Sequence, residues 1–165
     1  GKVGQILCAR EHLNSLDESS FTEIKSAIEE DPFLRTQFDM GARYIRTNCK
    51  SVEFTFAGLR TNLDSIKSKA RILLCWIDEA ESVTEMAWRT LLPTVRETDS
   101  EIWVSFNPLD PESATYQRFV DNPPDNAKVI RCNYDDNPFF PCVTCPSDKV
   151  IDNQEKVRKG IPLPE

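Results

Sequence analysis

The sequence predicts an α/β fold in which helices flank a mostly parallel sheet. Residues 72–77 form an unbroken apolar run, which is typical of a strand buried on both faces of such a sheet. Segments with strand character alternate with segments of helical spacing along the chain, as they do in right-handed βαβ units. The apolar run ends in two carboxylates, Asp78 and Glu79, and open α/β sheets bind ligands at the carboxyl ends of their strands.

The composition is that of a globular domain with an acidic balance. The 165 residues suit one domain with its own core, and 39% of them are hydrophobic and 28% charged. A net charge of −7 does not attract phosphate backbones, so DNA contact would need a local basic patch. The densest basic group is Lys67, Lys69 and Arg71, and such a group is usually a solvated loop. No secretory signal or apolar membrane span is visible, so we expect a reducing cytosol and cysteines that remain thiols.

Three elements are expected before the apolar run. Residues 3–9 are predicted to form a short buried strand. Residues 19–30 carry apolar side chains at helical spacing, and Pro32 is expected to close that helix. Residues 43–56 are predicted to form a β-hairpin inserted into the α/β pattern, with its turn at 48–51.

Four elements are expected after the two carboxylates. Thr84 is a good N-cap for a helix whose apolar face we interpret as core packing. Residues 101–106 are predicted to form another buried strand, and residues 114–120 a short helix. A last strand is expected over residues 127–132.

Two pairs of polar residues follow predicted strands and are candidates for a site. Asp78 and Glu79 follow the strand that, in nucleotide hydrolases of the P-loop type, carries the Walker B acid; alternatively, they cap the next helix. Ser105 and Asn107 end the next strand along the chain, where hydroxyl and amide groups can hydrogen-bond phosphate or water. The alternative for this second pair is a simple turn, because Asn-Pro is a common turn dipeptide.

Six short motifs succeed one another in an order that is more specific than any single motif. They are residues 8–11 (Cys-Ala-Arg-Glu), 54–59 (Phe-Thr-Phe-Ala-Gly-Leu), 66–68 (Ile-Lys-Ser), 76–81 (Trp-Ile-Asp-Glu-Ala-Glu), 101–108 (Glu-Ile-Trp-Val-Ser-Phe-Asn-Pro) and 133–139 (Asn-Tyr-Asp-Asp-Asn-Pro-Phe). This succession resembles the ATPase domain of phage large terminase subunits, the motors that package DNA into proheads. The resemblance assigns residues 1–141 to a partial ATPase domain of the P-loop NTPase type, and residues 142–165 to a Pro-rich tail outside the family.

The resemblance implies roles for the four polar residues. Asp78 matches the Walker B aspartate that is associated with Mg²⁺ through water, and Glu79 matches the catalytic glutamate that orients the attacking water. Ser105 and Asn107 match the coupling motif, which senses the γ-phosphate and passes hydrolysis on to movement. The implied cofactors are ATP and Mg²⁺, and the implied partners are double-stranded DNA, the portal protein and the small terminase subunit. The implied location is the cytoplasm of a bacterial host, and no membrane is implied as a partner.

The sequence also departs from the family pattern. The P-loop, Gly-x-x-x-x-Gly-Lys-Ser/Thr, does not occur; Gly1-Lys2 resembles it only superficially, because Val3 replaces the hydroxyl residue. We therefore expect an incomplete sheet with an unpaired edge, and weak or no ATPase activity from this chain alone. The nuclease domain that follows in the family is not part of the sequence. The alternative hypothesis is a non-catalytic interaction protein, a prophage remnant that self-associates through the unpaired edge.

Two smaller features leave their roles open. Cys142 and Cys145 form a single Cys-x-x-Cys between prolines, which lacks the further ligands of a structural zinc site, so we expect no zinc. Ring motors of this kind commonly use an arginine supplied by a neighbouring subunit. The candidates among which the sequence does not choose are Arg10, Arg43, Arg60 and Arg71.

Overall fold

A computed structural model describes residues 2–12, 20–60, 66 and 69–132 of the chain. The chain divides into two compact units, Gly1–Ala127 and Lys128–Glu165. The first unit holds all the helices and strands of the described residues. Three features expected from the sequence lie outside the described residues: the motif at 133–139, the Cys142 and Cys145 pair, and the tail that contains that pair.

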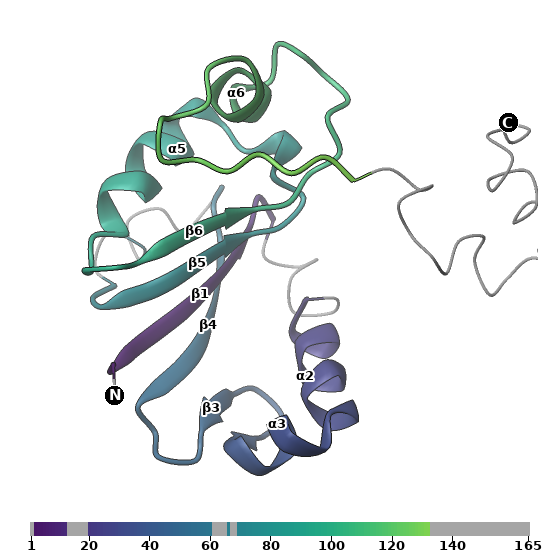
Figure 1. Ribbon diagram of the computed structural model, residues 1–165, viewed down its shortest axis with the longest axis vertical. Helices are drawn as coiled ribbons and strands as arrows, with labels where there is room; N and C mark the ends of the chain where they lie inside the picture. The colour runs from purple at the N-terminus through teal and green to yellow at the C-terminus, as the bar shows by residue number, and fades with distance from the viewer. Residues whose placement is uncertain (1, 13–19, 61–65, 67–68, 133–165) are drawn as a thin grey trace, which may run out of the picture. The chain divides into compact units, whose positions relative to one another are not determined.

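Six strands form one sheet with the spatial order β2-β3-β4-β1-β5-β6 (Figure 1). The strands are β1 (Gly4–Arg10), β2 (Phe38–Met40), β3 (Ile45–Thr47), β4 (Val52–Gly58), β5 (Ile72–Ile77) and β6 (Glu101–Val104). The four strands β4, β1, β5 and β6 pair in parallel, whereas β2, β3 and β4 pair antiparallel. The predicted α/β fold with a mostly parallel sheet and an inserted hairpin is therefore confirmed.

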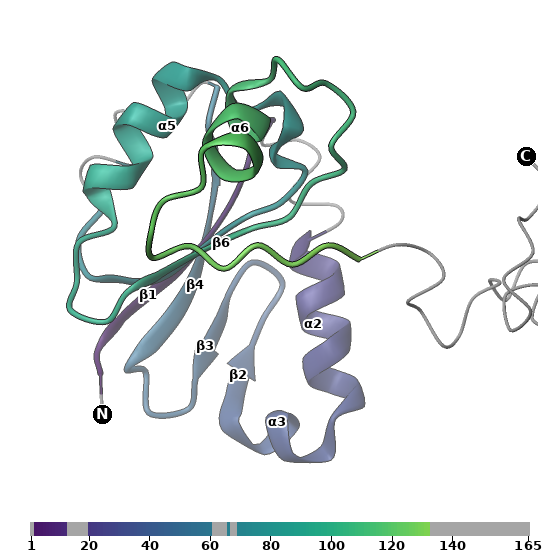
Figure 2. The same ribbon diagram turned by 45° about the horizontal axis from the view of Figure 1, so that its top comes forward.

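Helices lie on both faces of this sheet, as Figures 1 and 2 show. The helices are α2 (Ser20–Glu30), α3 (Pro32–Gln37), α5 (Glu85–Leu91) and α6 (Ala114–Tyr116); the short 3-10 helices are η1 (Ala80–Ser82) and η2 (Leu92–Thr94), and the π-helix is η3 (Gln117–Asp121). Helix α5 packs on one face of the sheet through the buried Trp88 and Leu91. Helix α2 lies on the other face, where the Phe21 ring meets the edge of the Phe56 ring at a centroid distance of 5.3 Å.

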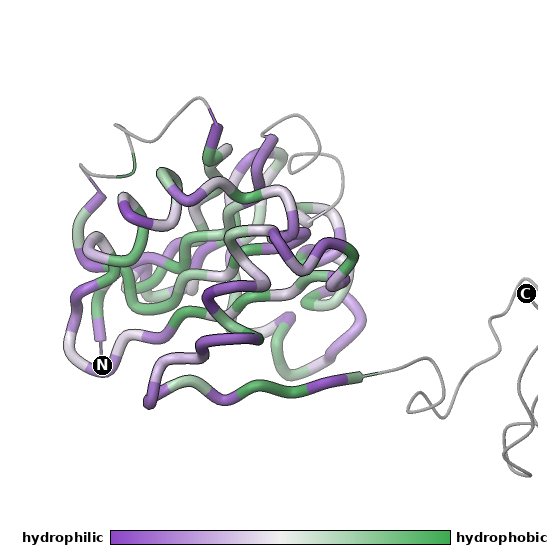
Figure 3. Tube along the Cα trace, turned by 90° about the horizontal axis from the view of Figure 1, so that it is seen from above, coloured by the Kyte–Doolittle hydropathy of each residue, from purple (hydrophilic) through white to green (hydrophobic). Residues whose placement is uncertain are grey.

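The main core lies between the sheet and α5. Alternate residues of the central strands point to this side, among them Leu7, Ala9, Cys75 and Ile77, all of them fully buried. Figure 3 shows hydrophobic segments running through the middle of the folded part, with many hydrophilic residues in its outer turns. Burial raises the pKa of the Cys75 thiol to about 12, in keeping with its role as a small core hydrophobe.

Most predicted elements appear within a residue or two of their expected ends. Thr84 caps α5 by accepting a hydrogen bond from the Ala87 N–H at 3.2 Å. The hairpin turn falls between Thr47 and Val52, as expected. Pro32 ends α2 but also begins α3, because Asp31 caps the Phe33 and Leu34 N–H groups and proline suits the first helical turn.

Two predictions about strands were wrong, and one strand was not anticipated. Residues 101–106 were expected to form a buried strand, but β6 is an end strand of the sheet, and its Trp103 is exposed. Residues 127–132, expected to form a strand, have no regular structure, and Val129 and Ile130 are 48% and 68% exposed. Two apolar residues between charged ones bury too little surface to hold a strand without a partner. Strand β2 was not anticipated, because its three residues follow α3 directly and gain strand character only from pairing with Ile45–Thr47.

Within the described residues, no helix is both long and apolar enough to span a membrane.

Candidate active site

The carboxyl ends of the four parallel strands meet at one edge of the sheet. The register pairs Ala9 of β1 with Ile77 of β5, and Ile77 with Val104 of β6. The residues that leave these strands, Arg10, Asp78 and Ser105, are therefore neighbours in space although they lie far apart in the sequence. Backbone hydrogen bonds fix this edge: the Asp78 N–H donates to the Ala9 carbonyl at 2.9 Å, and the Ser105 N–H donates to the Ile77 carbonyl at 3.0 Å.

Asp78 is the centre of the polar contacts at this edge. Its Oδ2 atom accepts a short hydrogen bond from Arg10 Nη2 and a longer one from the Ser20 hydroxyl at 3.3 Å. Its Oδ1 atom accepts from the Ser105 hydroxyl at 3.0 Å. The Arg10 and Asp78 side chains are only 10% and 20% exposed, so water screens this ion pair little.

These contacts keep Asp78 ionised. Burial by itself raises the pKa of the Asp78 carboxyl, but hydrogen bonds from Arg10 and Ser105 and the positive charge of Arg10 outweigh it. The net result is a pKa below the usual range of aspartate. Asp78 is therefore a charged hydrogen-bond acceptor at neutral pH and remains one in mild acid.

Glu79 is held differently from Asp78. Its backbone is left-handed, with a φ of 48°, a conformation that costs a non-glycine residue about 1–2 kcal/mol. Its side chain is 69% exposed, and one carboxylate oxygen lies 3.4 Å from Arg10 Nη1. Arg10 therefore contacts both acids at once, and the left-handed turn leaves the Glu79 carboxylate exposed at the carboxyl edge of the sheet.

Ser105 connects β6 to this acidic pair. Its hydroxyl accepts a hydrogen bond from the Trp76 indole N–H at 3.0 Å and lies 3.0 Å from Asp78 Oδ1. Because an indole N–H can only donate, the single hydroxyl proton of Ser105 is free to point to Asp78. A ligand that takes up this proton would have to break the bond between Ser105 and Asp78.

Asn107 does not join the cluster in the same way. It is exposed, and its side chain has no hydrogen bond to Asp78 or Glu79 in the part of the chain that the structure describes. Its backbone carbonyl accepts from the Leu109 N–H at 2.9 Å, which makes residues 107–109 a tight turn. Of the four residues singled out from the sequence, the structure thus brings together Asp78, Glu79 and Ser105, and places Asn107 two residues further on.

Sequence reasoning missed Arg10 and Ser20 as partners of Asp78. Arg10 was considered only as an arginine that could act on a neighbouring subunit, but it contacts the acids of its own chain. The signal was available: Arg10 directly follows a predicted strand, so parallel pairing puts it beside Asp78. Ser20 was hidden, because only the packing of α2 brings its hydroxyl to this edge.

The other three candidate arginines occupy different places. Arg60 follows β4, is exposed, and lies at the carboxyl edge of the sheet. Its backbone N–H donates there to the Glu11 backbone carbonyl at 3.1 Å. Arg71 precedes β5 and therefore lies at the opposite edge. Arg43 lies between β2 and β3 of the hairpin region.

The donor set suits a hard cation that is held largely through water. Among the described residues, no three His, Cys, Asp or Glu side chains lie close enough together to hold a metal ion. Two adjacent carboxylates and a hydroxyl are nevertheless the oxygen donors that Mg²⁺ accepts, and this ion usually keeps several waters and takes its other ligands from substrate phosphates. Asp78 and Glu79 therefore fit Mg²⁺ as water-mediated ligands.

Comparison with solved structures identifies the fold class. The chain is similar to the large terminase of a thermophilic bacteriophage, with a TM-score of 0.61 and 15% identity over 73% of this chain and 30% of that one. It is also similar to the large terminase of bacteriophage HK97, with a TM-score of 0.52 and 14% identity over 96% of this chain and 36% of that one. At such identities the likeness shows the fold alone, which is an α/β fold of the P-loop type. The chain spans about a third of the length of these proteins.

The sequence itself matches the family model described as phage terminase large subunit over residues 2–158. The chain therefore belongs to the phage terminase large subunit family, and the resemblance inferred from the ordered motifs is confirmed. The matched span includes part of the 142–165 segment, so the family model aligns with more of the chain than the motifs do. No curated protein matches the sequence.

Proposed function

We propose that this chain forms the acidic half of an ATP-hydrolysing site in a phage DNA-packaging motor. The observation that carries the proposal is the contact of Arg10 with both Asp78 and Glu79 at the carboxyl edge of the sheet, in a chain of the large terminase family. In this family, ATP hydrolysis drives DNA into proheads. Double-stranded DNA, the portal protein and the small terminase subunit are the partners we propose for the complete protein.

Glu79 and Asp78 would have different roles in hydrolysis. Glu79 is the more exposed carboxylate, and we propose that it accepts a hydrogen bond from the attacking water and orients it toward the γ-phosphate. Asp78, kept ionised by Arg10 and Ser105, would hold a Mg²⁺-bound water, which makes it the Walker B aspartate. When bound, Mg²⁺ would neutralise charge on the phosphate oxygens.

Ser105 would link this chemistry to movement. Its proton is shared with Asp78, and its backbone carries on from β6, so a phosphate or water that competes for the hydroxyl would pull on the end of that strand. The exposed Asn107 amide is close by in sequence and able to bind the same group. This pair is our proposed coupling motif.

The nucleotide assignment is supported by relatives. The large terminase of the thermophilic bacteriophage has been solved in complex with ADP and with ATP-gamma-S, and both structures resemble this chain, with TM-scores of 0.59 and 0.54. The P-loop amides and lysine that hold β- and γ-phosphates are not encoded in residues 1–165, so we expect weak binding and weak turnover from these residues alone.

The test is a nuclear magnetic resonance titration of the chain with Mg²⁺ and ATP-gamma-S, combined with an ATP turnover assay. We expect amide shifts confined to residues around 78–81 and 105–107, and any turnover to be lost in Glu79→Gln. Glu101→Gln, at the opposite end of β6, is the matched control and should behave as wild type. An absence of shifts at millimolar nucleotide, or turnover that survives Glu79→Gln, would contradict the proposal.

One observation favours the alternative of a non-catalytic interaction protein. Strand β6 is the last strand of the described sheet, and its Trp103 is 56% exposed. Self-association through this edge predicts a mass that rises with concentration in light scattering and returns to that of a monomer in Trp103→Lys. A monomer at all concentrations would count against this alternative.

A further inference from the structure

We infer that Thr115 is a positioning residue for Glu79, acting through the backbone of Ala80. The inference rests on the proposed role of Glu79 in orienting water. Thr115 does not face the acidic edge itself: it lies on α6, is fully buried, and donates a hydrogen bond to the Ala80 carbonyl from inside the protein.

Ala80 is fixed on both sides. Its N–H donates to the Ser105 carbonyl at 3.0 Å, and its carbonyl accepts from the Thr115 hydroxyl at 2.6 Å and from the Val83 N–H at 3.1 Å. Ala80 has no exposed surface. The peptide groups that flank this residue are therefore held by Ser105, which follows β6, on one side and by Thr115 of α6 on the other.

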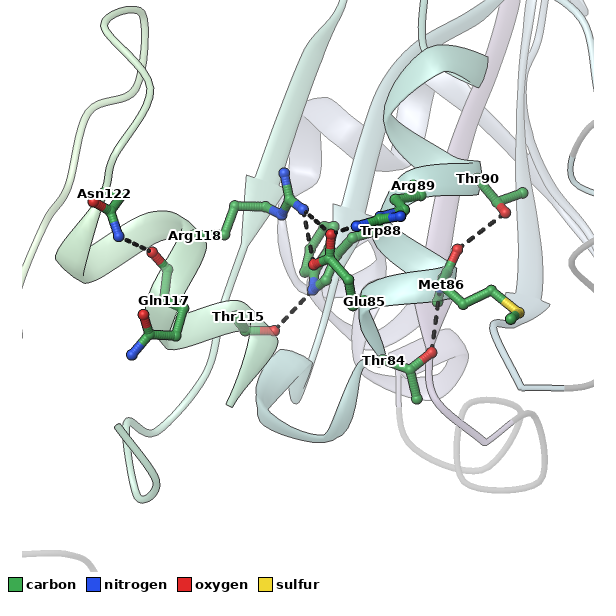
Figure 4. A network of polar contacts seen from close by, with 11 residues as sticks. Thr84, Glu85, Met86, Trp88, Arg89, Thr90, Thr115, Gln117, Arg118 and Asn122 are labelled. Atoms are coloured by element: carbon green, nitrogen blue, oxygen red, sulfur yellow. Dashed lines mark hydrogen bonds and ion pairs between the residues drawn. The ribbon is translucent and has the colours of Figure 1, made fainter. Parts of the chain in front are cut away.

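The direction of the Thr115 hydrogen bond is determined by its neighbours. The Trp88 indole N–H lies 3.0 Å from the Thr115 oxygen, as Figure 4 shows, and this group can only donate. The Ala80 carbonyl can only accept. The single hydroxyl proton of Thr115 must therefore point to the Ala80 carbonyl. The two hydrogen bonds, from Trp88 to Thr115 and from Thr115 to Ala80, can run in one direction only.

Glu79 depends on this clamp because little else holds it. Its side chain is 69% exposed, and among the described residues its one ion pair is the 3.4 Å contact with Arg10. Its left-handed backbone is not a conformation that glutamate prefers, and its side chain does not cap η1. The direction in which the carboxylate points is therefore set by the backbone of Ala80, whose N–H is held by Ser105 and whose carbonyl is held by Thr115.

Contacts between α5 and the segment formed by α6 and η3 hold Thr115 in place. Arg118 of the π-helix η3, which continues α6, donates from Nη2 to both carboxylate oxygens of Glu85 at 2.7 and 2.8 Å. Arg89 binds the same carboxylate through Nε at 3.0 Å, as Figure 4 shows. The Trp88 ring packs edge-on against Phe119 at 5.0 Å. Helix α5 is thus linked to η3 by these contacts and to α6 by the hydrogen bond between Trp88 and Thr115.

The variants separate the hydroxyl from the packing. Thr115→Val removes the hydroxyl and keeps the shape of the side chain, whereas Thr115→Ser keeps the hydroxyl. The double variant Trp88→Phe/Thr115→Val also removes the indole N–H, so no buried donor is left without a partner. Thermal unfolding of each variant, measured alongside, shows whether it is folded.

The first readout does not need activity. The ¹³C carbonyl and Cα shifts of Glu79 and Ala80 report the hydrogen bond and the backbone conformation. We expect them to move in Thr115→Val and in the double variant, and to stay at the wild-type values in Thr115→Ser. Unchanged shifts in both valine variants would overturn the inference, whether or not the wild-type chain hydrolyses ATP.

The second readout is ATP turnover, which separates this inference from the proposed function. We expect kcat to fall on the order of ten-fold in both valine variants, with KM within about two-fold of the wild type and recovery in Thr115→Ser. Wild-type turnover that persists unchanged in the valine variants would overturn the inference and leave the proposed function standing. A wild-type chain without turnover agrees with the weak or absent activity expected of residues 1–165 alone, and the carbon shifts then decide the role of Thr115.

Discussion

Arg10 is the residue on which the acidic edge depends. It is almost buried, and its guanidinium contacts two carboxylates of adjacent residues that would otherwise repel each other. Removing it would leave Asp78 as a charged group that is four-fifths buried, with two hydroxyls and the Glu79 backbone N–H as partners but no cation. An unpaired buried charge is far more costly than the pair is favourable.

Arg10→Met should therefore lower the free energy of unfolding by about 3 kcal/mol at neutral pH. The pKa of Asp78 is depressed in the folded wild type, so its stabilising contribution is complete above the aspartate pKa of the unfolded chain, about 3.9, and is lost as the pH falls through the folded value. The difference between wild type and variant should shrink over that acidic range. Urea unfolding at several pH values measures it.

The matched control is Arg89→Met. Arg89 is 77% exposed and pairs with Glu85 one helical turn away, so its loss should cost only about 0.5 kcal/mol. A loss of stability in Arg10→Met no larger than in this control would show that the contact between Arg10 and Asp78 contributes little.

Cys49 differs from the other described cysteines in its environment. Hydrogen bonding with the Ser51 side chain, and then with the Thr47 side chain, lowers the pKa of this exposed thiol to about 7. Burial raises the pKa of Cys8 and Cys75 to about 12. The thiolate is the reactive form, so these three cysteines should differ sharply in reactivity.

We expect iodoacetamide to modify Cys49 with a rate that reaches half its maximum near pH 7, while Cys8 and Cys75 stay unmodified in the folded protein. Ser51→Ala should slow the modification of Cys49 at pH 7, because it removes the largest cause of the lowered pKa. Peptide mass spectrometry against pH measures each site. An unchanged rate in Ser51→Ala would contradict the assigned cause.

At the scale of elements, helix α5 connects local sequence signals to the site. It begins at a threonine cap, and its first turn carries Glu85, which holds the arginines of α5 and η3. Its buried face carries the tryptophan that orients Thr115. The helix has only seven residues, so it cannot be stable without its cap and its packing.

Thr84→Ala should lower the free energy of unfolding by about 1 kcal/mol, because the Ala87 N–H loses its acceptor. Thr84→Ser should keep the cap. Thr90→Ala on the same helix is the control: its hydroxyl bonds only to the Met86 carbonyl, and we expect a change within about 0.5 kcal/mol (Figure 4). Equal losses in Thr84→Ala and Thr90→Ala would show that the cap has no special role.

At the scale of the molecule, parallel pairing brings the site together. The strands that carry Arg10, Asp78 and Ser105 are separated by about 60 and 25 residues of chain, yet they end at one sheet edge because β1, β5 and β6 run in the same direction. The pairing of β1 with β5 also requires a close approach of the two backbones at Gly4, where a side chain would collide with the Arg71 carbonyl oxygen.

The sequence by itself determined the elements and half of the site. A continuous apolar run defined the buried β5, and Asp78, Glu79 and Ser105 could be predicted because each follows a segment with strand character. Thr84 could be named as a cap because capping is a local hydrogen bond. Local patterns failed where strands were short: β2 exists only through its partner, and residues 127–132 have strand composition but no regular structure.

Only the tertiary structure decided which side chains serve the acids and how Glu79 is aimed. Ser20 and Thr115 come from two helices that are remote in sequence, and no periodicity links them to Asp78 or Ala80. Arg10 follows a predicted strand, but its place beside Asp78 depends on the pairing of β1 with β5. The physical reason is that a hydrogen bond depends on distances of about 3 Å between side chains, and those distances are set by how the elements pack rather than by the order of residues.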